Sequence, residues 1–264
     1  MTTEELIAAR RAEPWREALR KSKKNKERTD IPRVEMNELD AEYRSHTRLE
    51  EVNLGLTKEQ AIQEAQRCLD CPNPTCMQGC PVSINIPTFV KNIERGEFLE
   101  AAKVLKETSA LPAVCGRVCP QEKQCESKCI HLKMGKPAVA IGYLERFAAD
   151  YERESGNISV PEVAEKNGIK IAVVGSGPAG LSFAGDMAKR GYDVTVFEAL
   201  HEIGGVLKYG IPEFRLPNKI VDVEIEGLRK MGVKFLTNCI VGKTISYDDL
   251  HTDGFKGIFA ASGA

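Results

Sequence analysis

The chain has 264 residues, and its 37 basic and 38 acidic side chains give a formal net charge of −1. This length is enough for one large domain or two ordinary ones with a sizeable core. A charge so close to zero argues against nucleic acid or an anionic membrane as a partner. No apolar run approaches the roughly 20 residues of a membrane-spanning helix. The N-terminus has no apolar signal core, and its glutamates do not suit an acid-poor transit peptide. The composition therefore predicts a cytoplasmic protein.

The first residues are predicted to form a basic N-terminal extension over 1–33. Residues 4–21 have the pattern of a helix of mixed polarity, with few apolar side chains. From Arg10 to Arg33, ten basic residues stand against four acidic ones. This pattern suits a docking arm for an acidic partner surface or a solvated, partly ordered lead-in segment, and the sequence alone favours the second.

Helical patterns dominate the next part of the chain. Thr57 followed by Gln60 has the form of a capping box, which predicts a helix over about 58–69, and prolines after it prevent its continuation. Apolar residues at helical spacing then predict two helices broken near Gly96 and a last helix that ends near Tyr151.

Eight of the nine cysteines fall in two short clusters, at 68–80 and 115–129. Because thiols stay reduced in the cytosol, this density indicates metal or redox chemistry, and a disulfide framework is the alternative for a secreted protein. Four thiolates can hold a zinc ion or an iron-sulfur cubane. A single run ending in Cys80-Pro81 resembles a bacterial ferredoxin run more than the separate hairpins of zinc sites, although the second and third cysteines lie further apart. The spacing favours two 4Fe-4S clusters over structural zinc.

A polar segment over 152–168 is predicted to link two domains. From residue 169, an apolar strand enters a Gly-rich turn, a helix follows over about 178–190, and a second strand ends at Glu198. This order is the βαβ opening of a doubly wound domain. The remaining predicted elements are a helix over about 218–231 and strands over 232–236 and 257–262.

The Gly-rich turn carries a dinucleotide fingerprint, in which glycines allow a tight turn, a close pyrophosphate and helix packing. Glu198 stands at the spacing of the residue that accepts from a ribose hydroxyl. A turn needed only for packing is the alternative. The fingerprint does not separate FAD from a nicotinamide, but a second glycine pair and the need to pass single electrons to clusters favour FAD. The predicted cofactor-binding residues are Gly175, Gly177, Pro178, Ala179, Gly180, Glu198, Gly204, Gly205 and Leu207.

Three features together resemble the small (β) subunit of NADPH-dependent glutamate synthase: the cysteines from Cys68 to Cys129, VVGSGPAGL from Val173, and GGVLKYGIPEFRLP from Gly204. Relatives of that subunit include the N-terminal half of dihydropyrimidine dehydrogenase and the large subunit of NADH-dependent ferredoxin:NADP oxidoreductase. The resemblance covers the chain from about Val34 onwards. It implies an FAD that receives hydride from NADPH, and two 4Fe-4S clusters that pass electrons to a glutamate synthase large subunit or another acceptor protein.

The resemblance also implies two sets of cluster ligands. One cluster would be held by Cys68, Cys71, Cys76 and Cys129, and the other by Cys80, Cys119, Cys125 and the carboxylate of Glu145. Cys115 stays outside both sets. A carboxylate ligand changes the charge of a cluster and hence its reduction potential. Cys239, on a predicted strand, is expected to be a small buried hydrophobe.

The predicted fold class is α + α/β, with an α-helical domain carrying two 4Fe-4S clusters over 34–151, and the first part of a Rossmann-like FAD-binding domain over 169–264. Family members continue into an inserted NADPH-binding domain, so we expect this sequence to be a fragment that does not oxidise NADPH alone. The expected chemistry is electron transfer without a general acid or base. The alternatives are an electron-transfer subunit of the ferredoxin:NADP oxidoreductase or pyrimidine-reductase type, and a zinc-binding structural or regulatory subunit.

Overall fold

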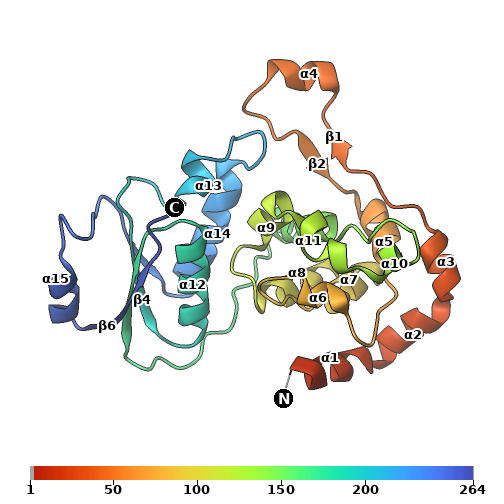
Figure 1. Ribbon diagram of the computed structural model, residues 1–264, viewed down its shortest axis with the longest axis horizontal. Helices are drawn as coiled ribbons and strands as arrows, with labels where there is room; N and C mark the ends of the chain where they lie inside the picture. The colour runs from red at the N-terminus through yellow and green to blue at the C-terminus, as the bar shows by residue number, and fades with distance from the viewer. Residues whose placement is uncertain (1–2, 264) are drawn as a thin grey trace. The chain divides into compact units, whose positions relative to one another are not determined.

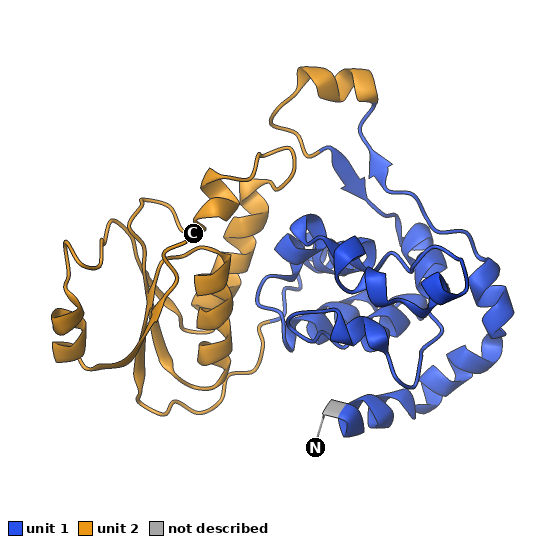
Figure 2. Ribbon diagram, in the orientation of Figure 1, with its two compact units in different colours: residues 1–40, 52–159 blue, residues 41–51, 160–264 orange. Residues whose placement is uncertain are grey.

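The computed structural model describes residues 3–263, which form two compact units (Figures 1 and 2). Unit 1 takes the chain up to residue 40 together with residues 52–159, and unit 2 takes residues 41–51 together with the chain from residue 160. Each unit has a hydrophobic core of its own. Within the described residues, no helix combines the length and the apolar character needed to cross a membrane.

Unit 1 is built mainly from helices, and its two short strands β1 and β2 pair antiparallel. Its elements are α1 (Thr3–Arg11), α2 (Pro14–Ser22), α3 (Asn25–Asp30), β1 (Asn37–Glu38), β2 (Asn53–Gly55), α5 (Lys58–Gln66), α6 (Thr75–Gln78), α7 (Ile86–Glu94), α8 (Phe98–Lys106), α9 (Pro112–Val118), the 3-10 turns η1 (Gln121–Lys123) and η2 (Glu126–Lys128), α10 (Ile130–Lys133) and α11 (Ile141–Ser155).

The core of unit 1 lies between helices α5, α7, α8 and α11. Phe89, Ile93, Leu105 and Leu144 are fully buried in it, as the helical spacing of apolar residues in these segments requires. Several of the clustered cysteines pack against the same core. The helical core therefore positions the thiols, which are attached to the turns at its edge.

The capping box at Thr57 is confirmed, since its hydroxyl accepts from the backbone N–H of Gln60 and the Gln60 side chain accepts from the N–H of Thr57. Helix α5 ends at Gln66, before the predicted end. The helix break near Gly96 is also confirmed, because α7 ends at Glu94 and α8 begins at Phe98. Helix α11 continues to Ser155, where Gly156 ends it in the left-handed conformation.

The prediction of one helix over 4–21 is wrong, because the chain forms α1 and α2 with a break before Pro14. Proline suits the first turn of a helix and cannot continue one from before. The expectation of a solvated lead-in segment is wrong as well. Arg16 and Arg28 are each 1% exposed, and both form ion pairs inside unit 1.

Unit 2 contains a parallel sheet with the strand order β5-β4-β3-β6. This order is that of the first half of a doubly wound sheet, so the predicted βαβ opening is confirmed. The elements of unit 2 are α4 (Ala41–His46), β3 (Lys170–Val174), α12 (Pro178–Lys189), β4 (Asp193–Phe197), α13 (Val206–Tyr209), α14 (Asn218–Lys230), β5 (Lys234–Leu236), α15 (Tyr247–Thr252) and β6 (Phe255–Ala260).

Cys239 differs from its prediction in two respects. It lies after β5 rather than on a strand, and it is only half-buried. Its thiol accepts a hydrogen bond from the hydroxyl of Thr244 at 3.7 Å, and its side chain packs at the edge of the core of unit 2. The apolar run around Cys239 suggested a strand, but the chain turns there.

Candidate functional site

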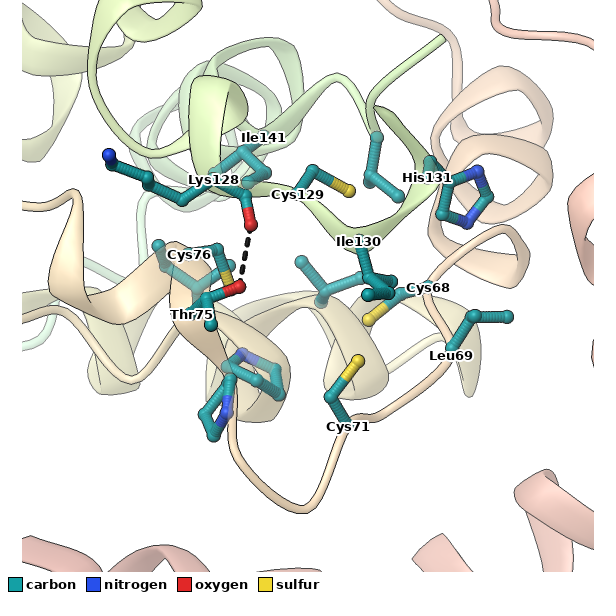
Figure 3. Close-up of a pocket in the computed structure, with 15 residues that line it drawn as sticks. Cys68, Leu69, Cys71, Thr75, Cys76, Lys128, Cys129, Ile130, His131 and Ile141 are labelled. Carbon is teal, nitrogen blue, oxygen red and sulfur yellow. Dashed lines mark hydrogen bonds between the residues drawn. The ribbon is translucent and has the colours of Figure 1, made fainter. Parts of the chain in front are cut away.

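A pocket in unit 1 is lined by four of the clustered cysteines. Cys68 follows helix α5, Cys71 lies in the turn beyond it, Cys76 lies on α6, and Cys129 precedes α10. Figure 3 shows their sulfur atoms around one pocket. The fold therefore brings together the four side chains that the resemblance gives to one cluster, including Cys129, which lies far from the others in the sequence.

The rest of the pocket wall is mostly apolar, with Ile86, Val90 and Ile141 among its lining residues. The hydroxyl of Thr75 donates to the carbonyl oxygen of Lys128 at 2.6 Å, and this bond joins α6 to the turn before Cys129 (Figure 3). An apolar wall with thiols has few hydrogen-bonding groups for an organic ligand. It suits a group that bonds to sulfur.

Burial raises the pKa of three of these thiols above its ordinary value. It raises the pKa of Cys68 to about 11, although the charge of Lys91 acts in the opposite direction. It also raises the pKa of Cys71 and of Cys76. A thiol with a raised pKa is protonated near neutral pH and is a poor nucleophile. A bound metal supplies the positive charge that releases the proton, so the pocket suits a metal group.

The spacing of the thiols bears on which metal group would fit. Four thiolates around one zinc ion must converge on a single point at about 2.3 Å. Among residues 3–263, no three His, Cys, Asp or Glu side chains are placed to hold a single metal ion. A 4Fe-4S cubane needs thiolates distributed around a larger group. Four cysteine side chains are a donor set that suits either a zinc ion or a 4Fe-4S cubane.

Cys80, Cys119 and Cys125 form a second group with Glu145, which lies on α11 and is 5% exposed. Burial raises the pKa of Cys125 to about 12, and the negative charge of Glu145 adds to the rise. Burial also raises the pKa of Cys80, on which both Glu145 and Cys119 act. These four side chains thus lie within electrostatic reach of one another. Three thiols and a carboxylate are a donor set that can hold an iron-sulfur cluster.

Cys115 lies beside the second group. It donates a hydrogen bond to Cys119, which lowers the pKa of Cys119 to about 7 and raises that of Cys115 well above its ordinary value. The side-chain amide of Gln121 donates to the carbonyl oxygen of Cys115 at 2.9 Å. The structure therefore places Cys115 next to a predicted ligand, although the resemblance leaves it outside both sets.

The turn that carries Cys68 and Cys71 is held by charged groups that the sequence did not reveal. Asp70 is fully buried between the two cysteines, and Arg16 and Arg20 form ion pairs with it. Burial alone would raise the pKa of Asp70, but the two arginines lower it below its ordinary value. The only signal in the sequence is a carboxylate between two clustered thiols.

Lys91 is a second charged residue that the sequence did not indicate, because it lies in the otherwise apolar part of α7. Its ammonium group is fully buried and donates to the carbonyl oxygen of Cys68 at 2.6 Å. It also donates to Glu94 at 2.5 Å, and Glu94 accepts from Arg28 at 2.8 Å. A buried cation thus lies beside Cys68.

Arg67 and His131 hold the backbone next to Cys68 and Cys129 in place. Arg67 directly precedes the first cysteine, and its guanidinium donates to the carbonyl oxygens of Ile31 at 3.1 Å and Ala138 at 2.8 Å. His131 is fully buried, and burial lowers its pKa. The neutral ring then donates through Nε2 to the carbonyl oxygen of Arg67 at 3.0 Å. This bond connects the segment after Cys129 to the residue before Cys68.

In unit 2, the Gly-rich turn lies between β3 and α12, and two of its glycines are required by the fold. Gly175 has a φ of +101°, and a Cβ there would lie 2.3 Å from the carbonyl oxygen of Ala261. A Cβ on Gly180 would lie 2.1 Å from the carbonyl oxygen of Gly175. Side chains at these two positions would push the strand and the helix apart.

Gly177 is different, because a Cβ there would meet no heavy atom within 4 Å apart from its chain neighbours. Internal packing therefore does not require a glycine at this position. Gly177 is the N-cap of α12, and Pro178 and Ala179 are its first residues. The first turn of a helix leaves backbone N–H groups without intrahelical partners, and the helix dipole adds positive charge there. This arrangement fits a phosphate group at the start of α12.

Glu198 follows β4 and lies beside the turn. It is 5% exposed, its Oε2 accepts from the backbone N–H of Ser176 at 2.9 Å and from the Ser176 hydroxyl, and its Oε1 accepts from the N–H of Leu200 at 2.8 Å. Both carboxylate oxygens of Glu198 thus accept hydrogen bonds from other residues of unit 2. A carboxylate oxygen has two lone pairs, so each oxygen can accept more than one hydrogen bond.

The second glycine pair lies against the first. Gly204 and Gly205 both have positive φ, and a Cβ on Gly205 would lie 2.9 Å from Cα of Gly177. The N–H of Gly204 donates to the hydroxyl of Ser176 at 3.0 Å. The sequence suggested a close approach to a bulky ligand, and the structure shows a close approach to the Gly-rich turn. Leu207, on α13, is 2% exposed, so its side chain is part of the packing.

Comparison with protein families assigns a class to each unit. Residues 44–157 match the family "dihydropyrimidine dehydrogenase domain II, 4Fe-4S cluster", and residues 173–231 match the family "NAD(P)-binding Rossmann-like domain". The first match contains both cysteine clusters and Glu145, and the second contains the Gly-rich turn and Glu198. The chain thus combines a 4Fe-4S domain with a NAD(P)-binding Rossmann-like domain.

Individual relatives show more closely which family the chain resembles. The NAD-dependent dihydropyrimidine dehydrogenase subunit PreT of Escherichia coli (strain K12) is 40% identical over 205 residues, which cover 78% of this chain and 49% of PreT. The glutamate synthase (NADPH) small chain of the same organism is 39% identical, with 77% of this chain and 43% of the relative covered. That of Azospirillum brasilense is 35% identical, with 76% and 42% covered.

The chain belongs to the family of glutamate synthase small chains and related dihydropyrimidine dehydrogenase subunits, as the resemblance predicted. It spans about half the length of the curated relatives that it matches.

Proposed function

We propose that the chain is an electron-transfer module that holds two 4Fe-4S clusters and an FAD. In the complete protein, electrons from NADPH would pass through these groups to a partner subunit of the glutamate synthase type. The observation that carries this proposal is the pocket where Cys68, Cys71, Cys76 and Cys129 meet. The clusters and the flavin supply the redox chemistry, and the chain binds, orients and electrostatically tunes them.

The first cluster is assigned to the pocket because four thiols line it and the rest of its wall is mostly apolar. Metal binding would release the protons of these buried thiols, because the thiolate is the form that binds a metal. The buried ammonium group of Lys91, which donates to the carbonyl oxygen of Cys68, adds a positive charge beside the cluster. Such a charge favours the reduced form of a cluster, whose net charge is more negative.

The second cluster is assigned to Cys80, Cys119, Cys125 and Glu145. This donor set includes a carboxylate, and the negative charge of Glu145 acts on Cys125. A carboxylate in place of a thiolate changes both the donor and the charge of the site. The two clusters would therefore differ in reduction potential, which gives electrons a direction between them.

FAD is assigned to unit 2, with its pyrophosphate at the start of α12. The support is the open space at Gly177, together with the position of Glu198 beside the turn. A flavin accepts a pair of electrons as hydride and releases them singly, which a nicotinamide does not do. The clusters accept single electrons, so a flavin is the group that connects them to NADPH.

The partner is assigned by analogy with the relatives. Glutamate synthase small chains and PreT are both named as chains or subunits of larger enzymes. We assign the chain to the glutamate synthase type, with a large subunit as the electron acceptor. A pyrimidine-reducing complex of the PreT type is the second candidate, supported by its similar identity to this chain.

Anaerobic purification tests the cofactors. The expected result is a brown protein with iron and acid-labile sulfide near eight each per chain, as two cubanes require, and with a bound flavin that is released on denaturation. A colourless, zinc-loaded protein would overturn the proposal in favour of a structural or regulatory subunit. Iron and sulfide at the expected level without flavin would overturn the FAD assignment alone.

Ligand variants test the two sets. Cys115→Ser should retain the full iron content, whereas Cys119→Ser should lose the iron of one cluster. Equal losses in both variants would contradict the second set. For Glu145→Ala, we expect a changed cluster spectrum and a shifted reduction potential, and an unchanged potential would count against ligation. In the full-length protein, NADPH-dependent glutamate formation with a large subunit, measured beside pyrimidine reduction, decides between the two partners.

A further inference from the structure

The first three helices carry buried basic side chains that the proposed function does not use. These helices, α1 to α3, lie outside the residues 44–157 that match the 4Fe-4S family. They nevertheless belong to unit 1, where Arg16 and Arg28 are each 1% exposed and Ile7 packs against the core. We name residues 3–30 the N-terminal arm.

The arm makes its densest contacts with Asp70. Arg16 donates from Nη2 to Oδ1 at 2.5 Å and from Nε to Oδ2 at 3.0 Å. Arg20 donates from Nη1 to Oδ2 at 2.7 Å. Arg11 donates from Nε to the backbone carbonyl oxygen of Asp70 at 2.9 Å. Three arginines of the arm thus hold both the side chain and the main chain of one residue.

Both the burial and the backbone conformation of Asp70 cost free energy. It is fully buried, and its φ of +52° lies in a region that side-chain-bearing residues rarely adopt. It belongs to no helix or strand, because α5 ends at Gln66 and α6 begins at Thr75. A buried carboxylate and a left-handed backbone both persist only where the surroundings compensate for them. The arginines of the arm pair directly with the carboxylate, and Lys91 adds a further positive charge nearby.

We propose that the N-terminal arm is a clamp on the cluster-binding turn. Through Asp70, it fixes Cys68 and Cys71 in position and surrounds that side of the pocket with positive charge. The inference rests on the proposed function, in which these two thiols bind the first cluster. Arg11, Arg16 and Arg20 are positioning residues, because they act on the ligands through Asp70. Two guanidinium groups against one carboxylate leave a positive surplus, which favours the reduced state of a cluster.

The variant Arg16→Gln tests the clamp. Removing one partner of a buried ion pair leaves an uncompensated charge, so we expect a chelator to release iron from one of the two clusters roughly tenfold faster or more. The reduction potential of that cluster should fall in a titration followed by electron paramagnetic resonance, and that of the other should stay unchanged. Arg16→Lys, which keeps the charge and loses the planar fork, should restore the potential more than the release rate.

Arg10→Gln is the matched control. Arg10 lies in the same arm and forms a bidentate ion pair with Glu107 at 2.7 and 2.8 Å, but it does not contact Asp70. Its iron release and potentials should equal those of the wild type. If Arg16→Gln fails to fold, Arg20→Gln gives the same test at a partly exposed site, with a smaller effect confined to the same cluster.

The outcomes separate this inference from the proposed function. A wild-type chain without iron would contradict the proposed function. It would also contradict the clamp, because the clamp acts on a bound cluster. A wild-type chain with full iron, together with an Arg16→Gln variant that behaves like Arg10→Gln, overturns the clamp alone. Equal acceleration of iron release from both clusters in Arg16→Gln would indicate a general loss of folding and would overturn the clamp as well.

Discussion

Gly116 lies where α9 and α11 pack together. The variant Gly116→Ala tests whether this close contact positions the second group of side chains, Cys80, Cys119, Cys125 and Glu145. A Cβ on Gly116 would lie 2.5 Å from the backbone N of Arg146 and 2.6 Å from its Cα. Ordinary contacts between such atoms are about 3.5–4 Å. The two helices would therefore have to separate by about 1 Å, and overpacking of this kind costs roughly 1–3 kcal/mol.

The separation would act directly on the site. Helix α9 leads to Cys119, and α11 carries Glu145 next to Arg146. We expect Gly116→Ala to lower the free energy of unfolding, measured in urea, by roughly 1–3 kcal/mol. We also expect it to lose the iron of the second group while the first group retains its iron. Iron content and cluster spectra of the anaerobic protein measure the second effect.

Gly227→Ala is the matched control for this prediction. Gly227 lies inside α14, where a Cβ would meet no heavy atom within 4 Å. Alanine favours a helix by up to about 1 kcal/mol over glycine, so this variant should gain stability. The reasoning is refuted if Gly116→Ala is as stable as the wild type, or if it loses iron equally from both groups.

Four further variants test other parts of the structure. Gly177→Ala should leave stability nearly unchanged and weaken flavin binding. Gly180→Ala should lower stability by roughly 1–3 kcal/mol, because its Cβ would clash with the carbonyl oxygen of Gly175. Equal thermal midpoints of the two variants would contradict this difference. Glu94→Gln leaves Arg28 and Lys91 buried without their shared carboxylate, so urea unfolding should show a loss of about 3–5 kcal/mol, and a loss below about 1 kcal/mol would contradict the pairing. Burial acts to raise the pKa of Asp150, but Arg117, Arg153 and Arg146 lower it below its ordinary value. A lowered folded pKa contributes stability above the unfolded value of about 3.9, and this contribution is lost as the pH falls through the folded value. Asp150→Asn should therefore be less stable than the wild type at pH 7, with a difference that shrinks on acidification; a difference that grows would refute the assignment.

Local patterns predicted the parts of the fold that depend on neighbours in the sequence. The capping box at Thr57 and the helix break near Gly96 follow from residues a few positions apart. The βαβ opening follows from an apolar strand, glycines and a helical period in one continuous stretch. In each case, the hydrogen bonds or the packing that decide the structure form within the pattern itself.

Long-range pairings could not be predicted in this way. Arg16 and Asp70 lie far apart in the sequence, and a run of basic residues looks the same whether it is solvated or buried. Cysteine spacing indicated a metal site, but it did not show that Cys129 meets the first three thiols. That grouping came from the resemblance to a family, and the fold places the four side chains together.

Arg67 has a consequence for the order in which the site is assembled. Its guanidinium and its carbonyl oxygen bind groups from three separate segments, at Ile31, Ala138 and His131, and none of these bonds involves a thiol. The residues next to Cys68 and Cys129 can therefore reach their places before iron arrives. For the proposed first cluster, insertion would then be a late step, into backbone that these hydrogen bonds already hold in place.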